Sequence, residues 1–482
     1  MIQVSGKNYR CLDDIQKGLK GGDLTCVQLV QAYLTEVKAT TDLNAYVEVY
    51  ENEAMTAARG LDERIHTSSA KLGPLFGAVL SVKDVIAQEN HHLTAGSRIL
   101  EGYTSIYTAT AVQRLLDADA IIIGRVNCDE FAMGSDNRTS VYGPVRNGEH
   151  KEHVPGGSSG GSAVSVQVNT CLASIGSDTG GSVRQPASFC GLIGFKPSYG
   201  RISRHGLIAY GSSFDQIGVI GKKLDDVTKI YEVMKGVDDY DATLIDPLMV
   251  EDRPIRKKLA YLKDAVEHPS LQPEIRETFL KKVKSLQERN IEVQPVDFEL
   301  IDYLIPAYYV LTSAEASSNL SRYDGLRYGR RSPHATTLLE SYTKTRTEGF
   351  GLEVKRRILL GTFVLSVGYY DAYFAKAQKV RRLIKEQISR VLAEYDGLLL
   401  PTTPRTAWKL GAEMSPVQIY LSDVFSVLAN LVGFPAVSLP MGKDVENLPF
   451  GIQLISGTFQ EHLLFVYSKL ILDDEDSVVE TI

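Results

Sequence analysis

The sequence lacks the patterns that would assign it to several common classes of protein. Its five cysteines are odd in number and scattered, and no two of them form a Cys-x-x-Cys pair, which argues against a zinc site and a disulfide framework. Such cysteine usage fits a reducing, cytoplasmic compartment. The cysteines are Cys11, Cys26, Cys128, Cys171 and Cys190.

Membrane and nucleic-acid patterns are also missing. No apolar run reaches the roughly 18 residues that a membrane helix needs, and residues 1–14 lack the basic and apolar regions of a signal peptide. The formal net charge is −7, and no block of lysine and arginine stands out. We therefore expect no membrane contact, and we expect the chain to be a poor binder of a phosphate backbone on its own.

Three familiar active-site motifs are absent. No Gly-Lys-Ser/Thr follows a glycine-rich loop, the glycine clusters contain no Gly-x-Gly-x-x-Gly, and no His-Glu-x-x-His occurs. Among the nine histidines, His91 and His92 precede a predicted loop, and His153 stands just before a glycine cluster. His153 could act as a base by proximity, or it could be a solvated loop residue. The sequence offers no metal site.

What the chain does have is a serine- and glycine-rich stretch at residues 155–191. Two clusters, GGSSGGS and GSDTGGS, flank a short apolar run, and Ser158 and Ser182 lie 24 positions apart. Glycine-rich backbone is entropically costly to order, but it allows N–H groups to come close to a reacting atom. The stretch therefore indicates acyl transfer.

The first cluster also matches Gly-x-Ser-x-Gly around Ser158 and Ser159. A nucleophile elbow of that type needs a strand that leads directly into the turn, and a histidine base. Residues 148–155 (GEHKEHVP) are polar and end in proline, which is not typical of such a strand. The pattern therefore disfavours an elbow.

Hydrophobic periodicity predicts an α/β fold with a mixed or parallel central sheet covered by helices on both faces. Apolar runs typical of buried strands lie at residues 77–85, 120–124, 258–262, 398–400 and 436–439, with a further apolar run at 172–175. Helical spacing is found at residues 25–38, with Thr25 as the cap, and at 51–64, 109–118, 273–289 and 417–432. Because no repeat or long linker occurs, we expect one large domain over residues 1–482, with a solvated acidic tail at 473–476.

Lys83 stands in the strand-like run 77–85, directly after its apolar residues. A free lysine has a pKa of about 10.4 and is protonated at neutral pH, but burial disfavours the charged form and lowers that pKa. A buried Lys83 is therefore a candidate general base. The alternative is that Lys83 pairs with Asp84 or with another carboxylate at the surface.

The second cluster could present a run of backbone N–H groups to a developing oxyanion. It reads Asp178-Thr179-Gly180-Gly181-Ser182, and Ser182 at the end of the run is a candidate nucleophile. The alternative is a glycine turn whose serine only caps the following segment. These residues by themselves leave both interpretations open.

Both clusters, at this spacing, resemble the amidase signature family, whose pattern is GGSSGG followed by G-S/T-D-x-G-G-S-V/I-R-x-P. That family uses a Ser–cis-Ser–Lys triad. The resemblance implies that Ser182 is the nucleophile, that Ser158 is a bridging serine in a cis peptide, and that Lys83 is the base. It also implies oxyanion-hole amides from Thr179, Gly180, Gly181 and Ser182.

Four later strings extend the resemblance over nearly the whole chain, to the A subunits of glutamyl-tRNA(Gln)/aspartyl-tRNA(Asn) amidotransferases. They lie at residues 199–218, 307–329, 353–384 and 448–456. The resemblance implies that the chain hydrolyses glutamine in a heterotrimer with the B and C subunits. It implies that ATP and Mg²⁺ bind to the partner subunit, which amidates a mischarged tRNA with the ammonia, while this chain binds no metal or cofactor. Whether the product is Gln-tRNA(Gln), Asn-tRNA(Asn) or both stays open.

Glutamine carries an α-carboxylate and an α-amino group, which need a cation and a carboxylate respectively. Arg357, in EVKRRI, resembles the family's carboxylate clamp, because arginine suits bidentate recognition, and Arg356 is the competing choice. Asp423 resembles the residue that holds the amino group. The alternatives are a helix-surface arginine and a helix-capping aspartate.

Two other functions stay open on the sequence. One is a stand-alone amidase that hydrolyses small or acyl amides, and the other is a non-catalytic scaffold for a partner. Residues 134–139 and 148–153 depart from the family's usual sequence, and we expect neither stretch to touch the triad. We expect them to affect peripheral loop contacts and partner docking instead.

Overall fold

The structure of the chain is a computed structural model that describes residues 1–65, 67 and 71–472. Within these residues, β1 (Ile2–Val4) and β2 (Lys7–Tyr9) form a small hairpin, and the remaining strands form a single large sheet. The large sheet runs in the order β10 (Glu292–Val296), β9 (Lys258–Leu262), β11 (Gly397–Pro401), β13 (Pro449–Ile455), β12 (Ala436–Lys443), β7 (Ile193–Lys196), β8 (Gln216–Gly221), β6 (Ala173–Asp178), β4 (Val79–Lys83), β5 (Ile121–Val126) and β3 (Tyr46–Val49).

The sheet is mixed, as the sequence predicts. Strands β10, β9 and β11 pair in parallel at one end, and β6, β4 and β5 pair in parallel toward the other. The strands between them, from β11 to β6, pair antiparallel, and β3 adds an antiparallel edge. Strands β4, β6 and β8 are buried along their whole length, as expected for strands covered on both faces.

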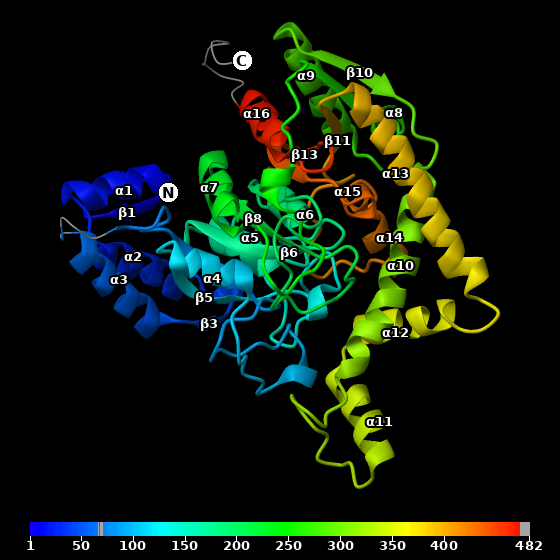
Figure 1. The fold of residues 1–482 in the computed structure, drawn as a ribbon, viewed down its shortest axis with the longest axis horizontal. Coiled ribbons are helices and arrows are strands. Elements are labelled where there is room, and N and C mark those ends of the chain that lie inside the picture. The colour runs from blue at the N-terminus through cyan, green and yellow to red at the C-terminus, as the bar shows by residue number, and fades with distance from the viewer. Residues whose placement is uncertain (66, 68–70, 473–482) are drawn as a thin grey trace.

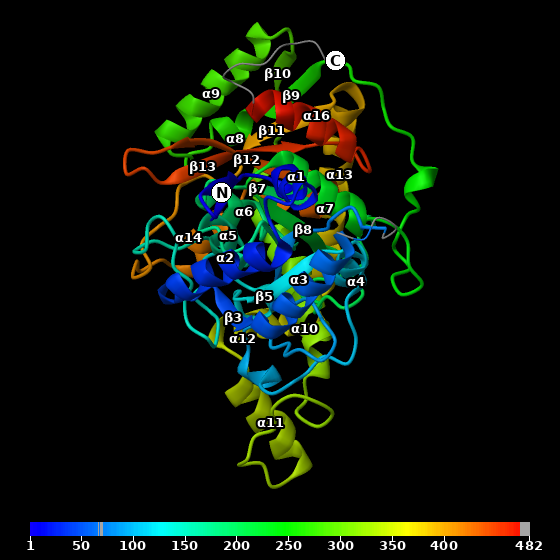
Figure 2. The ribbon, with the colours of Figure 1, turned by 90° about the vertical axis from the view of Figure 1, so that its left-hand side faces the viewer.

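Helices lie on both sides of this sheet (Figures 1 and 2), which confirms the predicted α/β layering. They are α1 (Leu12–Gly21), α2 (Cys26–Ala39), α3 (Glu51–Ile65), α4 (Thr110–Asp117), α5 (Gly160–Gln167), α6 (Arg184–Phe189), α7 (Leu224–Met234), α8 (Lys263–Val266), α9 (Pro273–Glu288), α10 (Leu304–Asn319), α11 (Leu338–Gly349), α12 (Leu352–Val364), α13 (Lys376–Glu394), α14 (Pro416–Leu421), α15 (Val427–Val432) and α16 (Glu461–Leu472). Helix α11 projects away from the body of the molecule in both views.

Most of the predicted elements appear with ends shifted by a few residues. Thr25 caps α2, because its side chain accepts a hydrogen bond from the Gln28 backbone N–H at 3.1 Å. Strand β9 has the predicted bounds, and the apolar run at 172–175 lies within or beside β6. The acidic tail predicted at 473–476 lies outside the described residues.

The predicted single helix over residues 417–432 is wrong. The segment forms two short helices, α14 and α15, with a turn between them that carries Asp423. Apolar spacing continues across the break, so periodicity does not reveal it. The Ser422 hydroxyl donates to the carbonyl of Ile419 at 2.5 Å, and such local side-chain bonds compete with regular helix geometry.

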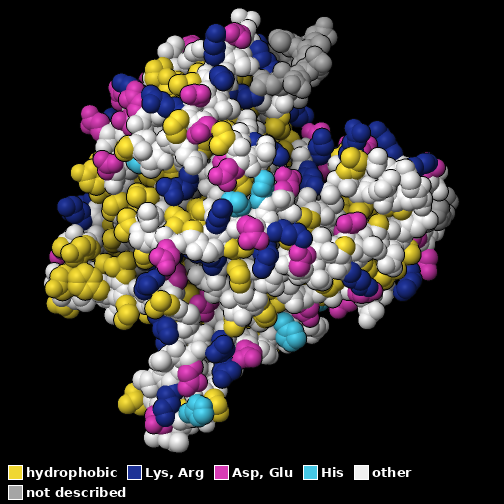
Figure 3. Space-filling model, turned by 180° about the vertical axis from the view of Figure 1, so that it is seen from behind, with side chains coloured by type: hydrophobic (Ala, Val, Ile, Leu, Met, Phe, Trp, Pro, Cys, Tyr) yellow, Lys and Arg dark blue, Asp and Glu magenta, His cyan; other side chains and the backbone are white. Residues whose placement is uncertain are grey.

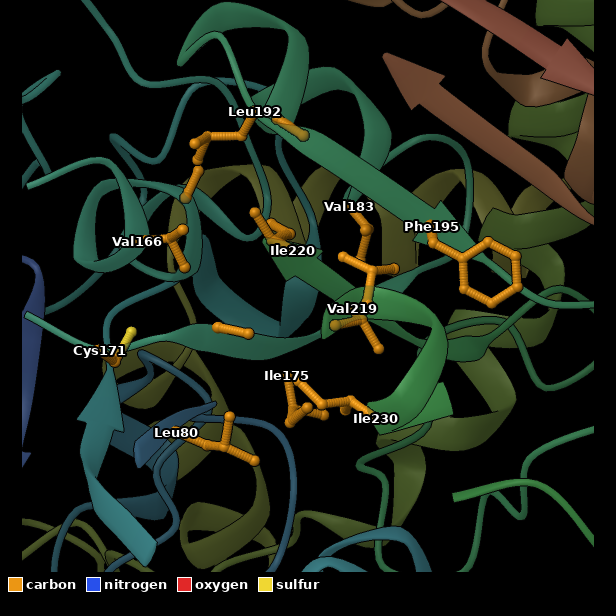
Figure 4. Close-up of a cluster of buried hydrophobic side chains, with 14 of the residues drawn as sticks. Leu80, Val166, Cys171, Ile175, Val183, Leu192, Phe195, Val219, Ile220 and Ile230 are labelled. Atoms are coloured by element: carbon orange, nitrogen blue, oxygen red, sulfur yellow. The ribbon is translucent and has the colours of Figure 1, made fainter. Parts of the chain in front are cut away.

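A buried apolar cluster supports the segment that carries the second glycine cluster (Figure 4). Leu80 of β4, Ile175 of β6 and Val219 of β8 meet there, and Val183 packs into the same cluster immediately after Ser182. All four of these side chains are fully buried. The core therefore fixes the position of the backbone on which the candidate nucleophile stands.

No helix in the described part of the chain is long and apolar enough to span a bilayer.

Candidate active site

The last residue of β4 places a lysine among serine hydroxyls. Lys83 is fully buried, and its Nζ lies 2.7 Å from Ser158 Oγ, 2.9 Å from Ser159 Oγ and 3.0 Å from Ser177 Oγ. The alternative pairing with Asp84 is not what the structure shows. Asp84 instead accepts hydrogen bonds from the backbone and hydroxyl of Thr94 and from a neighbouring glycine.

Burial lowers the pKa of Lys83 from its ordinary value to about 8. Desolvation is the largest cause, since moving the ammonium out of water disfavours the charged form. The nearby carboxyl groups of Asp129, Asp178 and Asp215 oppose this fall but do not cancel it. A substantial fraction of Lys83 is therefore neutral slightly above neutral pH, so it can accept a proton from a serine hydroxyl.

The two glycine–serine clusters lie against each other. The backbone N–H of Ser159 donates to the carbonyl of Ser182 at 3.1 Å, so the turn that carries Ser158 sits beside the turn that carries Ser182. The peptide bond between Gly157 and Ser158 is cis, as the family resemblance implies. Ser158 is fully buried, whereas Ser182 keeps 8% of its surface exposed. Of these two serines, Ser182 is therefore the more accessible to a substrate.

Glycine is required twice in the second cluster because other groups approach its backbone closely. A Cβ on Gly180 would collide with the Tyr308 hydroxyl, and a Cβ on Gly181 would collide with Ser426 Oγ. Gly181 also has a φ of +126°, a conformation that L side chains rarely adopt. These contacts hold the turn in one shape.

The backbone N–H groups of this turn divide into two sets. The N–H of Gly181, which the resemblance implies as an oxyanion donor, instead donates to Asp178 Oδ1 at 2.9 Å, so it is already engaged. Within the described residues, the N–H groups of Thr179, Gly180 and Ser182 donate to no protein acceptor. These three are the donors that remain for a substrate oxygen.

A buried ion pair stabilises the turn formed by the second glycine cluster. Asp178 and Arg184 are fully buried, and the Arg184 guanidinium contacts both carboxylate oxygens, at 2.9 and 3.0 Å. The Arg184 charge and hydrogen bonds outweigh the effect of burial and lower the pKa of Asp178 to about 2. Arg184 also donates to the carbonyl of Ser426 at 2.9 Å, which ties the turn to the segment that carries Asp423.

The prediction that residues 134–139 are peripheral is wrong. A Cβ on Gly157 would lie 2.6 Å from the backbone nitrogen of Asp136, so this stretch packs directly on the turn that carries Ser158. Gln185 joins the two, accepting from the Gly157 N–H and donating to the Ser135 carbonyl, each at 2.8 Å. The departure from the usual family sequence therefore lies in the wall of the site.

A cavity of about 390 Å³ opens beside this wall. Ser135 and Asp136 line it on one side, and residues from the start of α12 and from α14 line it on the other. Its volume falls within the range that is typical of small-molecule sites. Its lining residues are Glu130, Gly134, Ser135, Asp136, Arg138, Thr139, Gly351, Leu352, Glu353, Arg356, Arg357, Pro416, Ile419 and Tyr420.

Arg357 is held inside this cavity by one carboxylate and several aromatic rings. Its Nε donates to Glu353 Oε1 at 2.9 Å, its Nη1 donates to the Tyr210 hydroxyl, and the Tyr420 hydroxyl donates to the same Glu353 oxygen. The guanidinium carbon lies 5.1 Å from the centre of the Tyr309 ring. Aromatic faces and one carboxylate orient this charge firmly, which overturns the alternative of a helix-surface arginine.

Arg356, the competing choice for a carboxylate clamp, lies at the rim. Half of its side chain is exposed, and it pairs with Glu353 at 3.4 Å. Asp423 lies deeper, where its Oδ2 accepts a 2.6 Å hydrogen bond from the hydroxyl of Ser135. Burial raises the pKa of Asp423 to about 7, so an arriving cation would favour its ionised form.

His153 has no contact that would make it the base of this site. In the described structure it shares no hydrogen bond with Lys83, Ser158 or Ser182, and its ring stands edge-on to His150. Its side chain is also largely covered, so the alternative of a solvated loop residue does not hold either. Residues 148–155 contain no strand, as expected for a turn that is not a nucleophile elbow.

Several residues of the site are not found by sequence reasoning. Glu353 could have been predicted, because an acidic residue four positions before an arginine on a helix is placed to form an ion pair with it. No local sequence pattern predicts the contacts of Tyr210 and Tyr309 with Arg357, because the tertiary fold brings these residues together. No group of three or more histidine, cysteine or acidic side chains that could hold a metal occurs among the residues that the structure describes.

Taken as chemistry, the arrangement suits attack on an amide carbonyl. It has an accessible hydroxyl, a second hydroxyl in contact with a lysine of lowered pKa, three uncommitted backbone N–H donors, and an oriented cation in an adjoining cavity. Such a set can deprotonate a nucleophile, stabilise an oxyanion and hold a substrate carboxylate. A family model described as Amidase matches residues 28–465.

Curated relatives match over almost the whole chain. A protein of Chlorobium phaeobacteroides, named as the A subunit of glutamyl-tRNA(Gln) amidotransferase, is 45% identical over 472 residues, which cover 96% of this chain and 99% of the relative. A Fusobacterium nucleatum protein of the same name is 47% identical over 449 residues, covering 92% of each.

Solved structures agree with this relationship. The crystal structure of the A subunit of glutamyl-tRNA(Gln) amidotransferase from Thermotoga maritima is 38% identical, covers 94% of each chain and superposes with a TM-score of 0.76. A peptide amidase from Stenotrophomonas maltophilia has a TM-score of 0.79 at 26% identity and covers 96% of each chain. The fold is thus shared by an amidotransferase subunit and by a peptide amidase.

Proposed function

The chain belongs to the amidase family, and on that premise we propose that it is the glutamine-hydrolysing subunit of a tRNA-dependent amidotransferase. The observation that carries the proposal is the buried contact of Lys83 with Ser158 beside the turn of Ser182, next to a cavity in which Arg357 is oriented. The identity of about 45% to proteins named as the A subunit, over nearly the full chain, favours this function over a stand-alone amidase.

The proposed reaction begins with a proton transfer. Neutral Lys83 takes the hydroxyl proton of Ser158, which in turn takes the proton of Ser182, and Ser182 Oγ attacks the side-chain amide carbon of glutamine. The N–H groups of Thr179, Gly180 and Ser182 stabilise the oxyanion, while Gly181 provides the turn. Return of the proton through the same relay releases ammonia and leaves a glutamyl ester on Ser182. Water then hydrolyses the ester to glutamate by the reverse relay.

The cavity supplies the binding groups for a free amino acid. We assign the α-carboxylate of glutamine to the Arg357 guanidinium and its α-amino group to Asp423. Both side chains are buried, so each gains from an opposite charge that replaces water. A cavity with several charged side chains in its lining, in which Arg357 is oriented and Ser135 contacts Asp423, suits an amino acid better than it suits a neutral acyl amide.

The partners follow from the same proposal. The B and C subunits make up the rest of a heterotrimer, in which the partner subunit holds ATP and Mg²⁺, binds the mischarged tRNA and uses the ammonia. This chain contributes the hydrolase alone and binds no cofactor. The ammonia converts Glu-tRNA(Gln) to Gln-tRNA(Gln), the same chemistry would convert Asp-tRNA(Asn) to Asn-tRNA(Asn), and the enzyme acts in the cytoplasm.

The function is tested by measuring ammonia release from glutamine, by the chain alone and with the B and C subunits. We expect glutamine hydrolysis in the complex, and transfer of the amide nitrogen to a mischarged tRNA when ATP is present. Simple acyl amides serve as the comparison substrates. Efficient hydrolysis of simple amides by the chain alone, with none of glutamine, would establish the stand-alone amidase instead.

Replacing Arg357 with lysine is expected to raise KM for glutamine by about 10- to 100-fold, because lysine cannot form the bidentate pair with a carboxylate. Arg356→Lys is the matched control, since Arg356 is half exposed at the rim of the same cavity. We expect it to change KM less than about twofold. Steady-state kinetics on the assembled complex would contradict the assignment if Arg356→Lys had the larger effect.

A further inference from the structure

Exposed apolar side chains gather on one face of α12 and on the segment that follows it. On the helix, Leu352, Leu359 and Phe363 stand at spacings of seven and four residues, so they form one stripe. Figure 3 shows hydrophobic side chains gathered along this edge of the molecule. We call this surface the α12 face, and it comprises Leu352, Leu359, Leu360, Phe363, Val367, Tyr369, Tyr370 and Tyr373.

The exposure of the α12 face is too large for scattered surface residues. Leu359 is 70% exposed, Val367 is fully exposed, and the three tyrosines are each a little under half exposed. At about 100 Å² for each side chain, the face presents on the order of 800 Å² of apolar surface, which matches one side of a standard protein–protein interface. Monomeric proteins seldom leave so large a continuous apolar patch uncovered.

The residue types of the α12 face are those of an interface. Aromatic side chains are enriched in the centres of interfaces, and here Phe363, Tyr369 and Tyr373 pack against one another, with ring centres 4.4 to 6.1 Å apart. Arg356 lies within the same helical stripe and is half exposed. A partner surface that fits would therefore be apolar, with a carboxylate opposite Arg356.

The α12 face begins at the rim of the cavity that holds Arg357. Leu352 lines that cavity together with Arg357, and the stripe then runs away along the helix. At 1.5 Å per residue, Phe363 lies roughly 16 Å along the axis from Leu352. A protein seated on the face would thus lie beside the opening rather than across it, so glutamine could still enter.

We propose that the α12 face is the docking surface for the amidating subunit of the amidotransferase, an inference that rests on the proposed function. Ammonia is small and neutral when released, so it is lost to water unless the consuming subunit sits close to its source. The area, the aromatic composition and the position at the cavity rim all fit this occupant. A second copy of this chain does not consume ammonia, so a position beside the cavity would give it no functional advantage.

The test uses the full chain produced together with an affinity-tagged B subunit, with the C subunit present. The variant Leu359→Asp/Phe363→Asp places two carboxylates in the centre of the face, and Val367→Asp changes a side chain that is fully exposed and cannot disturb folding. We expect both to reduce, by at least about tenfold, the amount of chain that co-purifies with the B subunit. Leu248→Asp, at a leucine that is 93% exposed elsewhere, is the matched control and should co-purify like the wild type.

Thermal unfolding of each free variant checks that the fold is intact. Folded variants that co-purify like the wild type would overturn the proposal. It would also be overturned if light scattering showed the wild-type chain to be a dimer that these substitutions dissociate while the complex still assembles. If the wild-type chain itself failed to co-purify with the B and C subunits, the proposed function would fail, and that result is distinct from a loss confined to the variants.

Discussion

Replacing Ser182 with alanine is expected to lower kcat for glutamine hydrolysis in the assembled complex by about four to six orders of magnitude. The reason is that the Ser182 oxygen forms the covalent bond to the substrate, and no neighbouring group can take its place. Ser158 and Ser159 are fully buried against Lys83, whereas Ser182 is partly exposed. The measurement is ammonia release under saturating glutamine.

The matched control for this substitution is Ser162→Ala. Ser162 is a fully buried serine of α5 whose hydroxyl has no hydrogen-bond partner in the described structure, so its loss should leave kcat within about twofold. Mass spectrometry after treatment with an electrophilic glutamine analogue should find the label on Ser182 in the wild type and nowhere in Ser182→Ala. A Ser182→Ala enzyme that retained more than about one per cent of wild-type kcat would remove Ser182 from the nucleophile role.

The parts of the site that could be predicted are those encoded by local sequence. Lys83 follows a strongly apolar run, so hydrophobic periodicity predicts its position at the end of a buried strand. Burial at that position lowers the pKa of Lys83. The glycine clusters likewise indicate close backbone approach, which the contacts of Gly180 and Gly181 confirm. Both signals depend on residues adjacent in the chain.

The parts that could not be predicted depend on contacts between distant segments. Tyr210 reaches Arg357 across 147 residues, and Ser135 reaches Asp423 across 288. Hydrophobic periodicity cannot predict contacts between residues so far apart in the chain. For the same reason the sequence predicts a peripheral place for residues 134–139, although they form the wall between Gly157 and the cavity.

The break between α14 and α15 shows the same limit at short range. Residues 417–432 keep helical spacing because both halves bury apolar side chains, and no glycine or proline marks the turn at Ser422. That turn carries Asp423, whose pKa burial raises to about 7. Functional positions often break local rules in this way, because the geometry of the site competes with the regular element.

Replacing Lys83 with alanine is expected to lower kcat, measured at saturating glutamine, by about four orders of magnitude or more and to abolish the pH dependence of kcat near neutrality. In the wild type the base must be neutral, and the pKa of Lys83 is about 8. Activity should therefore rise with pH, with a slope of one on logarithmic axes, and level off above about pH 8. At pH 6 it should be about 100-fold below the plateau.

A second buried lysine offers a control that isolates the role of the base. Lys196 is also fully buried and its pKa is also lowered by burial, but its Nζ donates to three neutral oxygens, those of Pro197, Gln216 and Phe434, and to no serine hydroxyl. Lys196→Met should lower the thermal unfolding temperature, because it leaves buried acceptors unpaired, yet it should keep the midpoint of the pH profile. A wild-type rate that is flat from about pH 6 to 9, with chemistry limiting, would exclude Lys83 as the base, since a group of this pKa changes charge within that interval.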